Sequence, residues 1–84
     1  MITTWEQIEQ HIAACTRCPL SQTRHLPVMG RGSRNAQIML IAEAPGVQED
    51  QEGMPFVGRS GSILDGLLQS CSLKREDIYI TNIL

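Results

Sequence analysis

QIMLIA, at residues 37–42, is a short apolar run with polar and turn-forming residues on both sides. A run of this length favours a strand over a helix, and unbroken apolar character is typical of a strand buried on both faces, as in a parallel sheet. A second segment, DIYITNIL at residues 77–84, is rich in β-branched residues and predicts another strand. Together the two segments predict an α/β fold with parallel strands.

A helix is expected between these strands. Ser60 or Ser62 can cap it, and it is expected to end near Cys71, with that cysteine buried. Its apolar stripe has four members: Ile63, Leu64, Leu67 and Leu68. Residues 37–84 would then form one right-handed βαβ unit. Two strands and two helices are too few for a stable open sheet, so we expect a truncated part of a larger domain.

Residues 1–36 are expected to form a helix and a loop. Thr3 or Thr4 can cap a helix over residues 4–14. Glu6 or Gln7 is placed to complete a capping box by accepting a hydrogen bond from the N–H of the cap residue. The apolar residues of this helix share one face: Trp5, Ile8 and Ile12.

Two stretches are too rich in proline and glycine for regular structure. Residues 15–33 contain two of each and predict a loop with at most a short helical turn. Residues 43–61 contain two prolines and four glycines and predict a long loop without helix or strand. Loops of this length are usually functional or disordered.

Size and charge narrow the range of functions. A chain of 84 residues forms at most one small domain with a marginal core. The net charge of −2 gives no overall attraction to nucleic acid, yet residues 10–42 contain no acidic residue and four arginines. These are Arg17, Arg24, Arg31 and Arg34. Gathered on one face they would contact phosphates, whereas in a solvated loop they would not, and both readings stay open.

The first ten residues resemble neither a secretory signal nor a membrane span, so we expect a cytoplasmic protein without a membrane partner. A reducing cytosol disfavours a disulfide between Cys15 and Cys18, whose spacing puts both thiols within reach of one metal centre. On this pair alone, metal ligation and structural accident are equally good readings. A redox pair is less favoured, because the motif follows a helix and precedes Pro19.

Glu43-Ala44-Pro45-Gly46 follows the first strand, where open α/β sheets place their ligand sites. Pro45 and Gly46 can turn the chain so that main-chain N–H groups face a ligand, while Glu43 projects into the crevice. The alternative is a simple turn followed by a solvated glutamate.

Phe56 is the only phenylalanine and lies in a glycine-flanked loop, so it either plugs the core or stacks on a flat ligand. Asn82 is polar within an apolar run, and its buried amide needs partners. An amide both donates and accepts, so it can pair with a ligand edge that carries one acceptor and one donor, or with a neighbouring loop.

In this order, five motifs resemble those of the family 4 uracil-DNA glycosylases, over nearly the whole chain. They are Cys15-x-x-Cys18, Ile41-Ala-Glu-Ala-Pro-Gly46, Glu49-Asp50, Gly53-x-Pro-Phe-Val-Gly58 and Tyr79-Ile-Thr-Asn82. The resemblance implies a three-layer α/β/α fold with a central, mostly parallel sheet, of which these residues are the first two-fifths. The chain departs from the family pattern at Ala42, where glycine is common.

The same resemblance implies an iron–sulfur enzyme that removes uracil from DNA. Cys15 and Cys18 match the first two ligands of a [4Fe–4S] cluster, the other two being expected beyond Leu84. Cys71 matches no family ligand.

For catalysis, the resemblance implies that Phe56 stacks on the flipped base and that Asn82 reads its edge. The amide of Asn82 and N–H groups near Ala44 would stabilise the departing uracil. Glu43 and, by family analogy, Glu49 would orient or activate water or favour the cationic sugar.

The 84-residue chain alone is expected to be inactive, and the full-length protein to act as a monomer on uracil-containing DNA. A different hypothesis is a small zinc-binding or nucleic-acid-binding module that uses Cys15, Cys18, Cys71 and a histidine. A third is a member of the same superfamily that lacks glycosylase activity.

Overall fold

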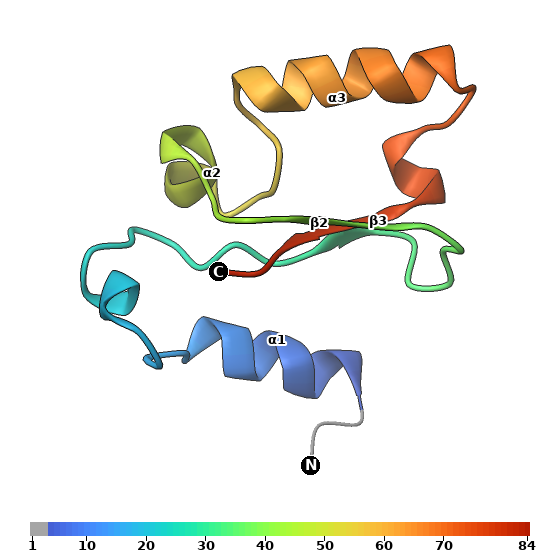
Figure 1. Cartoon of the computed structure of the whole chain (residues 1–84). Coiled ribbons are helices and arrows are strands. Elements are labelled where there is room, and N and C mark those ends of the chain that lie inside the picture. The colour runs from blue at the N-terminus through green and yellow to red at the C-terminus, as the bar shows by residue number, and fades with distance from the viewer. Residues whose placement is uncertain (1–3) are drawn as a thin grey trace.

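A three-stranded sheet lies at the centre of the structure, a computed structural model that describes residues 4–84 (Figure 1). Its strands are β1 (Arg31–Gly32), β2 (Met39–Ala42) and β3 (Tyr79–Asn82), in the order β1-β3-β2. β2 and β3 are parallel, with Leu40 opposite Ile80 and Ala42 opposite Asn82. The parallel pair predicted from the two apolar segments is confirmed.

β1 was not predicted. It lies within residues 15–33, which were expected to form only a loop, and it pairs antiparallel with β3. Two residues are too few for any hydrophobic period, so the strand exists only because β3 offers it hydrogen bonds. Gly32 has a φ angle of 119°, and a Cβ there would collide with the carbonyl oxygen of Ile78. Glycine thus lets β1 lie against the start of β3.

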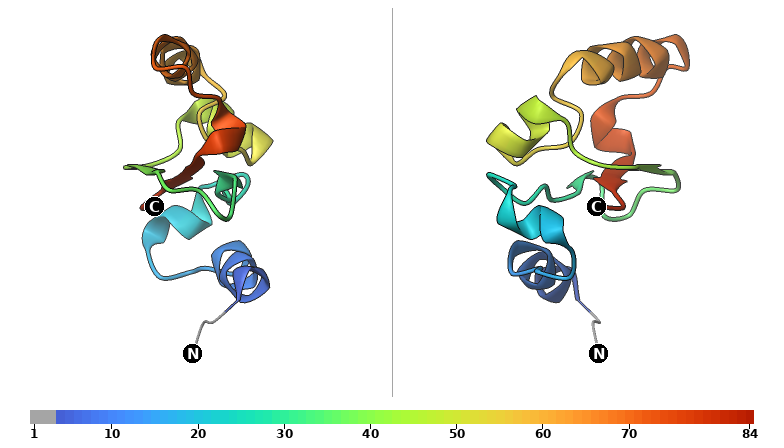
Figure 2. Two further views of the ribbon diagram at one scale, coloured as in Figure 1. Left: turned by 90° about the vertical axis from the view of Figure 1, so that its right-hand side faces the viewer. Right: turned by 60° about the vertical axis from the view of Figure 1, so that its left-hand side comes forward.

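The helices lie on both sides of this sheet. α3 (Arg59–Ser70) lies on one side and α1 (Trp5–Ala13) on the other, in all three views (Figures 1 and 2). The remaining helices are α2 (Val47–Glu52) and two short 3-10 helices, η1 (Pro19–Gln22) and η2 (Arg75–Asp77). No helix in the described part of the chain has the length and apolar character of a transmembrane segment.

α1 begins with the predicted capping box. Thr4 Oγ1 accepts a hydrogen bond from the N–H of Gln7 at 3.1 Å, and Gln7 Oε1 accepts one from the N–H of Thr4 at 3.2 Å. Thr3, the other candidate cap, lies outside the described residues. The ring of Trp5 then meets that of Tyr79 on β3, with centroids 5.0 Å apart. This contact holds α1 against the sheet.

The prediction that residues 43–61 lack regular structure is wrong, because they contain α2. Its six residues are too few to show a helical period in the sequence. Gly46 is the N-cap of α2, and its N–H donates to Glu49 Oε1 at 2.9 Å; Gly53, whose φ angle is 73°, is the C-cap. Tertiary hydrogen bonds, described below, hold this short helix in place.

The core lies between α3 and the sheet, where Leu68, Ile78 and Ile80 are buried. The prediction that the first strand is buried on both faces is wrong, since Met39 and Ile41 are 53% and 59% exposed. α3 covers only the face that carries Leu40 and Ile80. The opposite helix, α1, reaches β3 through Trp5 and leaves these two β2 side chains exposed.

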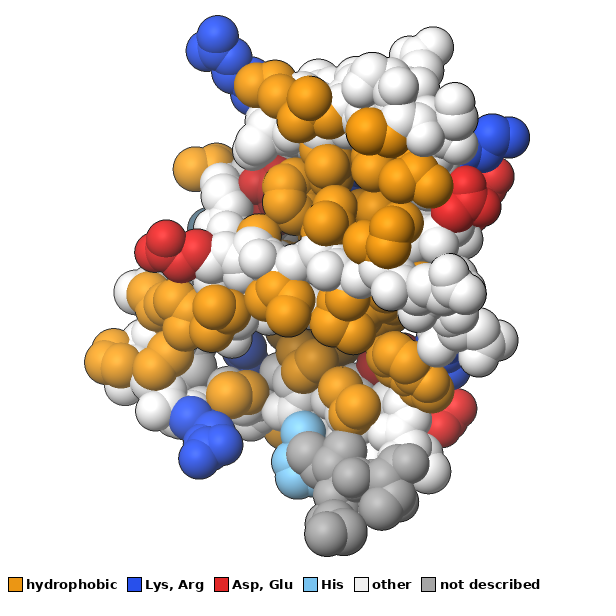
Figure 3. Space-filling view, turned by 45° about the vertical axis from the view of Figure 1, so that its right-hand side comes forward, with side chains coloured by type: hydrophobic (Ala, Val, Ile, Leu, Met, Phe, Trp, Pro, Cys, Tyr) orange, Lys and Arg blue, Asp and Glu red, His pale blue; other side chains and the backbone are white. Residues whose placement is uncertain are grey.

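Only part of the apolar stripe of α3 is buried. Leu68 is buried and Leu64 packs against the core, whereas Ile63 and Leu67 are about three-fifths exposed. In the space-filling view, hydrophobic side chains gather on one face of the molecule (Figure 3).

Candidate functional site

The carboxyl ends of β2 and β3 bring three of the predicted residues to one edge of the sheet. Ala42 lies opposite Asn82, and beyond the strands the N–H of Leu84 donates to the carbonyl of Glu43 at 3.1 Å. Ala44 follows directly. Parallel strands end at the same edge, so these residues lie where open α/β sheets place their ligand sites.

Asn82 carries the clearest sign of a binding group. Alternation along β3 puts its side chain on the same face of the sheet as Ile78 and Ile80, both buried. Its Nδ2 atom is buried and has no hydrogen-bond partner in the part of the chain that the structure describes. A buried donor left without an acceptor costs about 1–3 kcal/mol, so a ligand oxygen at this point would be strongly favoured.

Glu43 and Ala44 are both exposed at this edge. Within residues 4–84, the Glu43 carboxylate makes no hydrogen bond or ion pair, and the Ala44 N–H has no acceptor. Both groups are therefore available to a ligand or to water.

Phe56 combines the two roles considered for it. The side chain is only half-buried, and it packs against the core of Leu68, Ile78 and Ile80. It therefore lies on the face of the sheet that also carries Asn82. An aromatic ring that is supported by the core and partly exposed can stack on a flat ligand.

Glu49 is buried, and both of its carboxylate oxygens accept hydrogen bonds from main-chain N–H groups. Oε1 binds Gly46 at 2.9 Å, and Oε2 binds Val57 at 2.9 Å and Gly58 at 2.7 Å. Burial raises the pKa of Glu49, but the hydrogen bonds, with that from Gly58 the largest, outweigh it and hold the pKa below its ordinary value of 4.5. Such a carboxylate is a weak base, so the geometry favours a structural role for Glu49, in which it binds the N–H groups of the loops around it.

Asp50, the next residue, forms hydrogen bonds with a different segment, at His25 and Leu26. Its carboxylate accepts the N–H of His25 at 2.7 Å and contacts His25 Nδ1 at 2.7 Å, while its carbonyl accepts the N–H of Leu26 at 3.0 Å. The side-chain hydrogen bond from His25 is the main cause of a lowered pKa at Asp50. α2 thereby joins the segment that follows the cysteine pair to the loops around Phe56.

Cys15 and Cys18 are free thiols between α1 and η1, the first half-buried and the second exposed. Cys71 is also exposed, contrary to the prediction of a buried cysteine, because it follows the last residue of α3 instead of facing the core. Within residues 4–84, no three His, Cys, Asp or Glu side chains form a group that could hold a metal ion. The zinc site that the binding-module hypothesis needs is thus not formed by these residues.

Two of the four arginines of residues 10–42 make contacts within the fold. Arg34 pairs with Glu9 at 2.6 Å and lies over the ring of Trp5, and Arg24 donates to the carbonyl of Ala13 at 3.3 Å. Arg17 and Arg31 make no such contact within the described residues and stay exposed. Two of the four therefore serve the fold, and two are available to phosphate.

Arg75 is a further residue of this site that no sequence pattern indicated. Its guanidinium binds the main-chain carbonyls of Phe56 and Gly61 and the carboxylate of Asp65. A basic residue in a charged stretch gives no signal for such a role, because all three partners are 10 to 19 residues away along the chain.

Comparison with known proteins matches the sequence profile of the uracil DNA glycosylase superfamily to residues 29–84. A type-4 uracil-DNA glycosylase of Thermotoga maritima is 41% identical over 78 residues, which cover 93% of this chain and 41% of that protein. A type-4 uracil-DNA glycosylase of Archaeoglobus fulgidus is 44% identical over 79 residues, covering 94% of this chain and 40% of that protein. The chain thus spans about two-fifths of the length of these curated relatives.

Proposed function

The chain belongs to the uracil DNA glycosylase superfamily, and we propose that its protein removes uracil from DNA by hydrolysing the N-glycosidic bond. The observation that carries this proposal is the buried, unpartnered Nδ2 of Asn82 at the edge of the sheet where Glu43 and Ala44 also lie. The type-4 glycosylases named above support the same activity.

Recognition follows from the chemistry of an amide. With the target nucleotide turned out of the duplex, Phe56 stacks on the base and Asn82 pairs with its edge, donating to O4 and accepting from N3–H of uracil. Cytosine has an amino group in place of O4, so its donor would face the donor of Asn82. The amide thereby selects uracil.

Bond cleavage leaves negative charge on uracil and positive charge on the sugar. The N–H of Ala44 and the amide of Asn82 stabilise the departing uracil. Glu43 orients water or stabilises the cationic sugar, because its carboxylate is free of protein partners among residues 4–84. The catalytic role expected for Glu49 stays a prediction; its three main-chain hydrogen bonds favour holding over proton transfer.

We also propose that Cys15 and Cys18 supply two thiolates to a [4Fe–4S] cluster. Neither thiol is in a disulfide, and both belong to a short connection between two helices. Two thiolates are half of a four-cysteine set, so the residues present fit one side of a cluster. When bound, the cluster would supply iron–thiolate bonds that tie this connection to another part of the protein.

This proposal predicts the effect of Cys15→Ser. In a protein of the relatives' length, purified without oxygen, the substitution should remove most of the bound iron and the absorbance at about 400 nm, whereas Cys71→Ser should leave both unchanged. Iron content and absorbance are the measurements. Colourless zinc-containing protein would count against an iron–sulfur cluster.

For the complete fold, we propose three layers with a central, mostly parallel sheet. In a protein of the relatives' length, further chain is expected to cover the exposed side chains of Met39 and Ile41. The monomeric state and the cytoplasmic location stay predictions.

A chimera tests the function. The chain would replace the 78 matched residues of the Thermotoga maritima relative, and uracil release from labelled DNA would be measured for the chimera, for that relative and for the 84-residue chain alone. We expect release by the first two and none by the chain alone, whose described residues offer two of the four cluster ligands. A folded chimera without activity would refute the proposal for this segment.

A further inference from the structure

The backbone of Phe56 has a conformation that side chains of its size rarely adopt. Its φ angle is 54°, in the left-handed region that favours glycine. A bulky residue stays there only when its surroundings hold it, and such residues gather at functional sites. The neighbouring contacts identify what holds Phe56.

The peptide group between Phe56 and Val57 is bound at both ends by side chains of opposite charge. Its carbonyl accepts a hydrogen bond from Arg75 Nη2 at 2.6 Å, and its N–H donates to Glu49 Oε2 at 2.9 Å. Because a peptide group is planar, these two bonds fix its orientation and with it the torsion that follows the Cα of Phe56.

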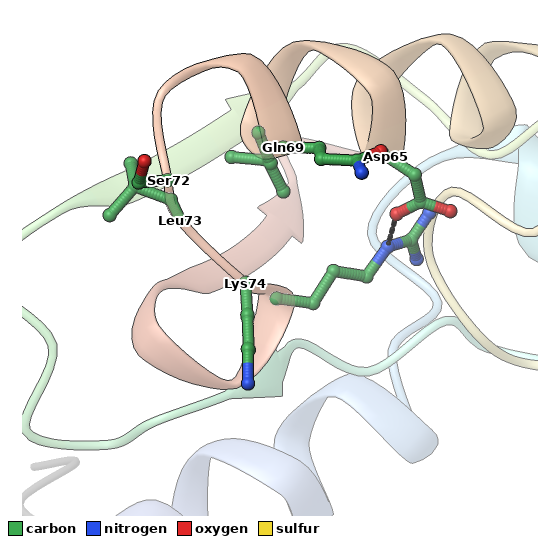
Figure 4. Close-up of a pocket in the computed structure, with 7 residues that line it drawn as sticks. Asp65, Gln69, Ser72, Leu73 and Lys74 are labelled. Atoms are coloured by element: carbon green, nitrogen blue, oxygen red, sulfur yellow. Dashed lines mark hydrogen bonds and ion pairs between the residues drawn. The ribbon is translucent and has the colours of Figure 1, made fainter.

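Arg75 binds several partners in addition to the carbonyl of Phe56. Its Nη1 also donates to the carbonyl of Pro55 at 3.4 Å, and its Nη2 to that of Gly61 at 3.1 Å. Its Nε donates to Asp65 on α3 at 2.6 Å, the dashed line that ends on Asp65 in Figure 4. The planar guanidinium serves all of these partners at once, which the single ammonium of a lysine cannot do.

We propose that Arg75 is a positioning residue that acts through Phe56. With Glu49 it forms a clamp on the peptide group after Phe56 and so sets where the aromatic ring lies. Arg75 belongs to η2, which leads directly into β3, and Asn82 ends β3. The clamp therefore ties the stacking ring to the strand that carries the base-reading amide. The effect on uracil release rests on the proposed function, whereas the clamp itself does not.

Limited proteolysis tests the clamp without any enzyme assay. Chymotrypsin cleaves after aromatic residues, and the bond after Phe56 is the one that Arg75 and Glu49 hold. In the 84-residue chain, Arg75→Met should speed cleavage after Phe56 about tenfold or more, because bonds to a charged group are lost. Lys74→Met, at the neighbouring exposed position, should leave it unchanged.

Cleavage after Tyr79 is the internal control, since β3 pairs on both sides. In a variant that stays folded, equal acceleration at Phe56 and Tyr79 would overturn the proposal, as would unchanged cleavage after Phe56. Should Arg75→Met leave no folded chain, Asp65→Asn provides the milder test. It keeps an oxygen that can accept from Nε but removes the negative charge, so the bond to Arg75 is weakened, and cleavage after Phe56 alone should become faster.

A double-mutant cycle in the chimera tests whether Arg75 acts through the ring. Arg75→Met should lower kcat/KM for uracil release about tenfold when Phe56 is present and less than about twofold when Phe56 is already alanine. The same loss in both backgrounds would show that Arg75 acts elsewhere. If the chimera releases no uracil, the proposed function fails, and the proteolysis result still decides the clamp.

Discussion

Asn82→Ala is expected to lower uracil release by the chimera about 10²–10³-fold, the loss typical of removing one donor that stabilises a developing anion. The same substitution removes the proposed contact that distinguishes uracil from cytosine. Single-turnover release from labelled DNA measures the loss. Asn35→Ala changes the other asparagine of the chain, which is exposed, and should leave the rate unchanged.

The same variant should not be less stable than the parent chain. Nδ2 of Asn82 has no acceptor within residues 4–84, so its removal relieves a buried donor whose isolation costs about 1–3 kcal/mol. The midpoint of thermal unfolding should therefore be equal or higher. A loss of activity without a loss of stability separates a binding role from a structural one.

Two results would contradict this account of Asn82. A rate within about twofold of the unmodified chimera would show that Asn82 does not contribute to uracil release. A large fall in the unfolding midpoint would mean that the amide serves a neighbouring loop.

Glu49→Gln is expected to destabilise the 84-residue chain by about 2 kcal/mol, because an amide cannot accept all three main-chain hydrogen bonds and leaves at least one part-buried N–H unpaired. Urea or thermal unfolding measures the change. Glu52→Gln is the matched control, since Glu52 lies in the same helix, is exposed, and makes no hydrogen bond or ion pair within the described residues.

The pH dependence of stability gives a second test of Glu49. Its pKa is lowered in the folded state, so the ionised form stabilises the fold. This contribution is fully present above the ordinary pKa of 4.5 and is lost as the pH falls through the lower folded value. The loss of stability below pH 4.5 should therefore be smaller in Glu49→Gln than in the parent chain.

The pKa of Asp50 is also lowered, mainly by its side-chain hydrogen bond with His25. Its contribution to the stability of the fold is therefore also lost as the pH falls. Comparing Glu49→Gln with the parent chain isolates the part due to Glu49, because Asp50 is present in both. An unchanged acid profile in the variant would show that the ionised carboxylate of Glu49 does not hold the loops.

Local patterns in the sequence determined the elements that are long enough to show them. The capping box at Thr4, the apolar run of β2, the β-branched run of β3 and the stripe of α3 each predicted an element that is present. The order of the short motifs also indicated the superfamily, which the comparison confirms. Parallel pairing then placed Glu43 and Asn82 at one edge, because strands of the same direction end together.

Contacts between distant residues decided the rest. β1 and α2 are two and six residues long, too short for a period, and they exist because β3 and the Glu49 carboxylate provide partners. Likewise, the exposure of Met39 and Ile41 depends on where α1 packs, which no local pattern records. The clamp of Arg75 and Glu49 on Phe56 joins residues up to 19 positions apart. A hydrogen bond of that kind depends on the folded path of the chain, so only the tertiary structure could reveal it.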